Sequence, residues 1–167
     1  MPDQAPEKSK QARLLGLVIA ALIVISDQLS KPFLLDLMEK NPGGIEVTPF
    51  FNLVMVWNRG VSFGMFSGAG DERRWILIAA AAAVTVWLLI WLWRGPARLV
   101  TVALGLVIGG ALGNIGDRLR FGAVADFFDF HAFGWHWPAF NIADCAIVVG
   151  VCLLLLDSLL PRPNGQS

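Results

Sequence analysis

Four long apolar segments constrain this sequence more than any other feature. A helix needs about 20 residues to cross about 30 Å of hydrocarbon. The second and fourth segments meet that length outright, and the first and third meet it when their polar ends are included. The sequence therefore predicts an all-α membrane protein with four transmembrane helices in a single domain, residues 1–167. The predicted spans cover about residues 14–32, 75–93, 99–117 and 139–160.

The composition agrees with a lipid environment. The chain is 56% hydrophobic, and its formal net charge of zero indicates no nucleic-acid partner. The first apolar segment follows Lys8, Lys10 and Arg13, as a secretory signal peptide would. It is followed by "ISDQLSK" instead of a small-residue cleavage site, so we expect it to be retained as a span.

Six of the 13 basic residues lie in the terminal segments and in one short turn. Lys and Arg in short loops favour the cytoplasmic side. The two longer connections, about 36–74 and 118–138, balance their basic residues with Asp and Glu. We therefore expect cytoplasmic termini and two outward-facing loops. The residues that set this orientation are Lys8, Lys10, Arg13, Arg94, Arg98 and Arg162.

Polar residues of three predicted helices fall at one depth. The first and third helices run outward and the fourth runs inward, so their polar ends all lie near the outer face. Scattered solvated charges would not gather in this way. The residues concerned are Asp27, Asn114, Asp117, Arg118, Asn141 and Asp144.

The first outward connection has a strand-like pattern. Residues 43–66 alternate and are rich in Val, Phe and Thr, with Pro and Gly punctuation. We expect a small β-structure that leads into an interfacial segment. The following stretch, "FSGAGDERRW", is expected to lie on the membrane surface as a link.

Two groups of polar residues share helix faces. Asp27 and Lys31 are four residues apart and can pair. Asn114, Asp117 and Arg118 also share one face. A structural role at the helix ends is one interpretation of both groups, with Asp117 paired either with Arg118 or with Lys31.

Asp126 and Asp144 are the strongest candidates for chemistry. Asp144 lies in an apolar helix with no basic residue within one turn, and an intramembrane carboxylate without a partner costs several kcal/mol. The turn "HAFGWHWP" is long enough to return Asp126 to its side. Two adjacent carboxylates cannot both ionise easily, so one keeps a proton while the other remains a base. Such a pair can activate water against an amide.

Other chemistries find less support in the same loop. Asp126, Asp129, His131 and His136 offer a metal alternative, but the loop is short and contains no H-E-x-x-H motif. Asp129 is expected to face solvent or to cap the loop, because residues three apart on a strand point to opposite faces. The serines have no nearby His base, so nucleophilic catalysis is a weak hypothesis. No metal or cofactor is expected.

Two other classes of protein remain as alternatives. A small transporter or channel could use Asp117, Asp126 and Asp144 as an ion relay, but the inner helix halves, such as "LLGLVIAAL", are almost wholly apolar. A non-catalytic assembly or chaperone subunit would need no pair of aspartates.

Five motifs resemble those of the lipoprotein signal peptidase (signal peptidase II) family in order and in spacing. The resemblance runs from the first to the fourth predicted helix. Ala125 stands where the family often has Val before its first catalytic aspartate, which changes no chemical group. The motifs are "DQLSK" (27–31), "NRGVSFG" (58–64), "GNIGDRLR" (113–120), "VADFFDF" (124–130) and "FNIAD" (140–144).

The resemblance implies an aspartic endopeptidase of the bacterial inner membrane with its active site near the periplasmic face. It would remove signal peptides from prolipoproteins, cutting just before the diacylglyceryl-modified cysteine. The resemblance also implies a periplasmic β-cradle, a surface helix or loop, contact with membrane lipid, and inhibition by globomycin-type cyclic peptides.

The resemblance also assigns roles to individual residues. Asp126 and Asp144 match the catalytic pair. Other matching positions surround the substrate or support the pair, namely Asn58, Asn114, Arg118 and Asn141. A third set, Asp27, Lys31 and Asp117, matches positions that hold the helix ends together.

Overall fold

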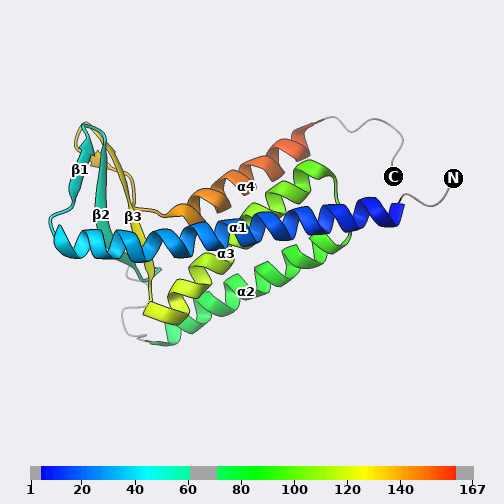
Figure 1. Cartoon of the computed structure of the whole chain (residues 1–167), viewed down its shortest axis with the longest axis horizontal. Coiled ribbons are helices and arrows are strands. Elements are labelled where there is room, and N and C mark those ends of the chain that lie inside the picture. The colour runs from blue at the N-terminus through cyan, green and yellow to red at the C-terminus, as the bar shows by residue number, and fades with distance from the viewer. Residues whose placement is uncertain (1–4, 61–70, 161–167) are drawn as a thin grey trace.

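The structure, a computed structural model, describes residues 5–60 and 71–160. Within these ranges, four helices are long and apolar enough to cross a membrane, which confirms the prediction of four transmembrane helices (Figure 1). They are α1 (Ala5–Lys40), α2 (Asp71–Trp93), α3 (Arg98–Phe121) and α4 (Ile142–Leu159).

Helix α3 occupies the centre of the bundle. Of its apolar span, 67% is buried inside the protein, against 17% to 22% for the other three helices. Glycines allow this close packing: a Cβ at Gly109 would stand 2.7 Å from the Ala20 carbonyl oxygen of α1, and one at Gly110 would overlap the Ala143 carbonyl of α4. α3 therefore brings the polar ends of α1 and α4 together around its own last turns.

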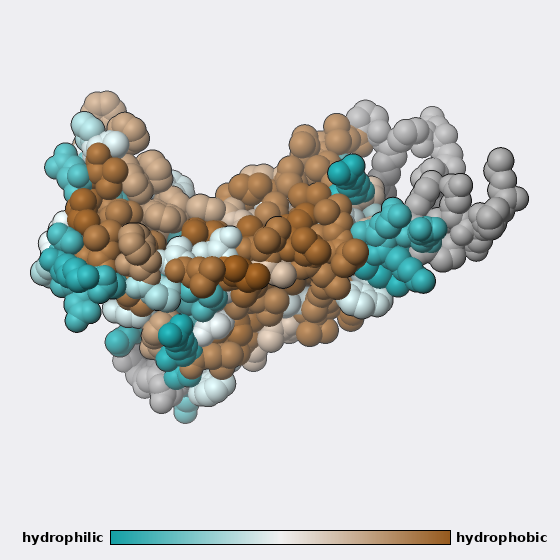
Figure 2. Space-filling model, viewed as in Figure 1, coloured by the Kyte–Doolittle hydropathy of each residue, from teal (hydrophilic) through white to brown (hydrophobic). Residues whose placement is uncertain are grey.

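The outer surface of the bundle is apolar. Leu22, Ile76 and Trp87 are 57%, 66% and 60% exposed, and each lies within a span. Figure 2 shows this apolar surface as a brown band between hydrophilic ends. A surface of this kind needs lipid as its solvent, so the chain is a multi-pass membrane protein.

α1 continues eight residues past the predicted end at about residue 32, with Pro32 inside the helix. The extension is polar on one side, where Asp36 and Lys40 pair at 2.6 Å. Its other side packs on the sheet, where Met38 is buried with Ala125 and Phe127. This contact with a distant strand stabilises residues 33–40 as a continuation of α1 past Lys31 and Pro32, where the predicted span ends.

A small antiparallel sheet stands at the C-terminal end of α1 (Figure 1). It confirms the predicted β-structure in the first outward connection, and the second connection completes it. β2 pairs with β3 through Val56 opposite Asp126 and Trp57 opposite Ala125. The strands, in spatial order, are β1 (Ile45–Thr48), β2 (Phe51–Asn58), β3 (Val124–Ala132) and β4 (Trp135–His136).

The expected surface helix or loop falls largely on residues 61–70, which lie outside the described residues.

Candidate active site

Asp126 lies on β3, where the strand passes the N-terminus of α4. Its side chain is completely buried. Oδ1 accepts a hydrogen bond of 2.7 Å from the side-chain amide of Asn141. Oδ2 has no hydrogen-bond partner among the described residues. A buried carboxylate oxygen without a donor is costly, so this atom is available to a proton, a water molecule or a substrate.

Asp144 lies in the first turn of α4. Asn141 is the N-cap of this helix and accepts a 2.9 Å hydrogen bond from the Asp144 backbone N–H, while the Asp144 carboxylate accepts from the Asn141 backbone N–H at 3.3 Å. This is a capping box. Asn114 of α3 donates to the Asp144 carboxylate at 2.8 Å. The half-buried side chain therefore has a structural role in addition to any chemical one.

Asn141 contacts both aspartates, because its side chain donates to the Asp126 carboxylate and accepts from the Asp144 backbone N–H. The predicted return of Asp126 to the side of Asp144 is thus present in the fold. The pKa of Asp126 is raised to about 6, first by burial and then by the negative charge of Asp144. The amides of Asn58 and Asn141 act in the opposite direction and favour the ionised form.

Behind the two aspartates lies a buried ion cluster of Asp27, Lys31 and Asp117. The Lys31 ammonium is 2.6 Å from a carboxylate oxygen of each aspartate, and both carboxylates are fully buried. The predicted pairing of Asp27 with Lys31 is confirmed. Asp117 was predicted to pair with either Arg118 or Lys31, and in the structure it forms an ion pair with Lys31. A Cβ at position 113 would be 2.7 Å from Asp27 Oδ2, so glycine at this position leaves room for the cluster.

The ion cluster holds the backbone immediately before each candidate aspartate. Asp117 accepts a 3.1 Å hydrogen bond from the N–H of Ala125, the residue before Asp126. Asp27 accepts one of 3.1 Å from the N–H of Ala143, the residue before Asp144. Because one lysine binds both carboxylates, the cluster fixes β3 and α4 relative to each other.

Gln28 also belongs to this cluster, and we did not predict it. Its amide donates to Asp117 at 2.9 Å and to Asp27 at 3.1 Å. Gln28 lies three residues before Lys31, and this spacing places the two side chains on neighbouring positions of one helix face. Helix periodicity was therefore the signal in the sequence that could have identified Gln28.

Asn58 and Arg118 border the site. Asn58 ends β2 opposite Val124 and is exposed, and its own side-chain oxygen accepts from the Gly60 N–H at 2.8 Å. Arg118 donates to the Asn114 carbonyl at 3.3 Å. Its guanidinium also lies within electrostatic reach of both candidate aspartates.

Of the two positions expected for Asp129, facing solvent or capping the loop, exposure to solvent is wrong. The side chain is buried and accepts from Asn52 at 3.1 Å and from His136 Nδ1 at 2.8 Å. Burial raises the pKa of Asp129, but hydrogen bonds from His136 and Asn52 outweigh it, so the net shift is downward. The β3–β4 hairpin supplies His136 by folding it back over the strand, and the neighbouring β2 supplies Asn52 opposite Asp129.

The histidines do not join the candidate aspartates in a metal site. His131 and His136 stack on each other with ring centroids 4.9 Å apart, and His136 binds Asp129. In residues 5–60 and 71–160, no group of three or more His, Cys, Asp and Glu side chains could hold a metal ion. The arrangement around Asp126 instead suits acid–base chemistry, because a carboxyl group that keeps its proton toward neutral pH lies beside a second carboxylate.

Comparison with known proteins places this geometry in a family. The family model described as signal peptidase (SPase) II matches residues 19–160. The lipoprotein signal peptidase of Methylorubrum extorquens is 46% identical over 155 residues, which cover 91% of this chain and 90% of the relative. That of Rhodopseudomonas palustris is also 46% identical and covers 92% of this chain and 96% of the relative.

Solved structures agree with the sequence relatives. Two structures described as a bacterial membrane enzyme superpose with TM-scores of 0.72 and 0.75, at 28% and 29% identity. They cover 91% and 88% of this chain and 93% and 94% of the solved chains. Family match, relatives and fold thus agree over most of the sequence, and the chain belongs to the signal peptidase II family.

Proposed function

We propose that Asp126 and Asp144 form the catalytic pair of this membrane peptidase. As a member of the signal peptidase II family, the chain is an aspartic endopeptidase that removes signal peptides from prolipoproteins. One observation carries the proposal: a fully buried Asp126, whose pKa is raised to about 6, shares Asn141 with Asp144.

The proposed mechanism uses one shared proton. The ionised carboxylate takes a proton from water as the water oxygen attacks the scissile carbonyl carbon, and the protonated carboxyl gives its proton to the carbonyl oxygen. The tetrahedral intermediate then collapses. The carboxyl that accepted the water proton gives it to the leaving nitrogen and the C–N bond breaks. As the C=O bond forms again, one hydroxyl of the intermediate returns its proton to the other carboxylate, so the pair regains its starting protonation. The raised pKa favours Asp126 as the holder of the resting proton.

The remaining site residues support this pair in the proposal. Asn114 and Asn141 orient the two carboxylates through the hydrogen bonds that they donate. Asn58 and Arg118, at the border of the site, contact the substrate. The ion cluster of Asp27, Lys31 and Asp117 positions the backbone from which the pair projects.

We further propose that the substrate is held through its lipid as well as its peptide. Figure 2 shows a notch between the sheet and α4, and these elements carry Asp126 and Asp144. A diacylglyceryl-cysteine anchored in the bilayer beside this notch would place the preceding peptide bond at the catalytic pair, and positioning of this kind lowers the barrier to amide hydrolysis. A globomycin-type cyclic peptide would inhibit by occupying the same notch.

In the proposed setting, the chain acts as a single peptidase domain in the bacterial inner membrane, without metal or cofactor. Both termini are cytoplasmic and the site lies near the periplasmic face, as the distribution of basic residues indicates. Reporter fusions after Arg98 should report cytoplasm and fusions near His131 the periplasm. A periplasmic report after Arg98 would reverse the orientation.

The experiment uses two prolipoprotein substrates with the same peptide sequence, one diacylglyceryl-modified on cysteine and one unmodified. The purified enzyme should cleave the modified substrate with much the higher kcat/KM. Similar values for both would exclude lipid-guided positioning and indicate a more general signal peptidase. Cleavage of neither substrate, by an enzyme of normal thermal stability, would contradict the peptidase assignment itself.

A further inference from the structure

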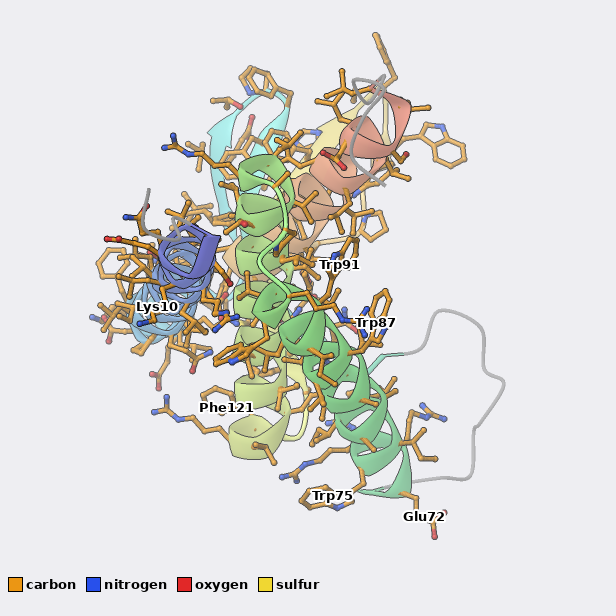
Figure 3. All side chains as sticks on the ribbon, turned by 90° about the vertical axis from the view of Figure 1, so that its right-hand side faces the viewer. Lys10, Glu72, Trp75, Trp87, Trp91 and Phe121 are labelled. Atoms are coloured by element: carbon orange, nitrogen blue, oxygen red, sulfur yellow. The ribbon has the colours of Figure 1, made fainter. Side chains whose placement is uncertain are left out.

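The end of the bundle opposite the candidate active site contains a cavity of about 750 Å³. It lies between the first turns of α1, the turn that joins α2 to α3, and the first turn of α3. Figure 3 looks onto this end of the molecule, where Lys10 marks the start of α1. The residues that line the cavity include Ser9, Gln11, Leu15, Arg94, Arg98 and Thr101.

The cavity is positively charged. Arg94 and Arg98 both line it, and no Asp or Glu among the described residues does. Neither guanidinium makes a hydrogen bond or ion pair with any side chain or carbonyl in the described part of the chain. Two uncommitted arginines at one concave site favour a ligand with negative charge and several acceptor oxygens.

The start of α3 adds to this preference. Its N-cap, Ala97, provides no side-chain acceptor, so the first N–H groups of the helix have no capping partner from that residue. Free N–H groups at a helix start favour an anion. The Ser9 and Gln11 side chains supply further polar groups at the wall of the cavity.

Arg13 shows that the neighbouring basic residues are not all equivalent. Its Nε donates to the Trp93 carbonyl at 3.0 Å, and its guanidinium lies 6.0 Å from the Trp93 ring centroid. Arg13 therefore caps the last turn of α2 by binding a free carbonyl, whereas the Arg94 and Arg98 guanidinium groups remain available to bind a ligand. Basic residues are expected at this end of the bundle because they set the orientation of the chain in the membrane. That role does not require two of them to line one cavity.

The surroundings of the cavity indicate the source of the anion. Leu14 is 64% exposed and Trp93 50% exposed, and they precede the cavity-lining residues Leu15 and Arg94 in the sequence. Leu15 lines the cavity itself. A free phosphate ion would use only the arginines, whereas a phospholipid would also place its acyl chains along these apolar surfaces.

We propose that this cavity binds the phosphate group of an anionic phospholipid from the leaflet at the α2–α3 turn. The bound lipid links α1 to that turn, where the two already pack closely: a Cβ at Gly95 would be 2.8 Å from Ser9 Oγ. The site is separate from the proposed catalytic pair, which projects from β3 and α4 at the other end of the bundle.

The test measures lipid binding to the full-length protein in detergent by native mass spectrometry and thermal unfolding. Phosphatidylglycerol should bind and raise the Tm, while phosphatidylcholine and free glycerol 3-phosphate should do neither. Arg94→Gln and Arg98→Gln should each weaken phosphatidylglycerol binding about fivefold. The doubly substituted Arg94→Lys, Arg98→Lys protein keeps the charge and should lose less affinity than the double Gln variant.

Lys10→Gln is the matched control, because Lys10 is exposed at the same end of α1 but does not line the cavity. It should bind phosphatidylglycerol as the unmodified protein does. If Lys10→Gln loses as much phosphatidylglycerol affinity as the arginine variants, the lipid is attracted by the general surface charge, and the proposed site is wrong. Equal binding of glycerol 3-phosphate would identify a soluble phosphate as the ligand and overturn the lipid. Prolipoprotein cleavage by each variant reports whether it is folded.

Discussion

Asn141 donates a 2.7 Å side-chain hydrogen bond to Asp126 while serving as the N-cap of α4. The residue that starts the helix bearing Asp144 therefore also orients the carboxylate on β3. Its side-chain oxygen accepts from the Asp144 N–H, and its side-chain NH₂ group donates to Asp126. The two roles therefore depend on different atoms of one side chain. A substitution can separate them.

Asn141→Ser should preserve the helix cap and lose the contact with Asp126. Serine caps helices about as well as asparagine, but its shorter side chain cannot reach the carboxylate. We expect kcat to fall by about 10²-fold, with KM little changed, because the carboxylate is no longer held in position. Steady-state kinetics on a lipidated substrate, with thermal unfolding as the control, measure this. Unchanged kcat would show that Asn141 acts only as a cap.

Asp126→Asn should stabilise the protein at pH 8. In the folded state the pKa of Asp126 is raised from 3.8 to about 6, so the native state binds more protons than the unfolded state between these values. The contribution of this carboxyl to stability therefore falls as pH rises from about 4 to about 6, and above pH 6 its ionised form costs about 2–3 kcal/mol. The variant avoids that cost.

Thermal unfolding of Asp126→Asn at two pH values tests whether the substitution stabilises the protein at pH 8. The Tm of the variant should exceed that of the unmodified protein by several degrees at pH 8, about 2–4 °C per kcal/mol. The difference should shrink toward pH 4. A variant that is less stable at pH 8 would mean that the ionised carboxylate makes favourable contacts in the fold.

Lys31→Met should destabilise the protein far more than Lys40→Met. Both lysines pair with an aspartate four residues earlier at 2.6 Å, but the Lys31 pair is buried and the Lys40 pair is exposed. Removing Lys31 leaves two buried carboxylates without their cation, at a cost of about 3–5 kcal/mol. Removing Lys40 should cost at most about 1 kcal/mol. Thermal unfolding in one detergent compares the two, and equal effects would exclude a structural role for the buried cluster.

Cleavage should survive chelation, because the described residues offer no adequate set of metal ligands. His131→Ala and His136→Ala should also retain cleavage, since these side chains bind each other and Asp129 rather than the candidate pair. Activity is measured before and after chelator treatment. Loss on chelation that is restored by zinc, together with inactive His variants, would assign the chemistry to a metal.

The apolar and alternating patterns of the sequence predicted the main elements of the fold. The four spans and the β-structure follow from periodicity and length, which depend only on residue type. The end of α1 does not, because Lys31 and Pro32 interrupt the apolar pattern, whereas the helix continues through residues 33–40 and packs Met38 against β3. Contacts between distant segments decide such boundaries.

The same limit applies to the candidate site. The sequence predicted that Asp126 returns to Asp144, since an unpaired carboxylate in an apolar helix needs a partner. It did not predict that Asp27 and Asp117 bind the backbone before each aspartate, because hydrogen bonds to a backbone N–H leave no trace in residue type. Asp129 was misplaced for a similar reason, as its partners come from β2 and from the far strand of a hairpin.

Prolipoprotein cleavage by purified Asp126→Asn and Asp144→Asn tests the proposed catalytic pair most directly. Asp129→Asn is the matched control, because Asp129 is a buried aspartate on the same strand with different partners. Each candidate substitution should lower kcat/KM by about 10³-fold or more while the protein still accumulates in the membrane, and Asp129→Asn should retain cleavage. Appreciable turnover by either Asp126→Asn or Asp144→Asn would contradict the catalytic pair.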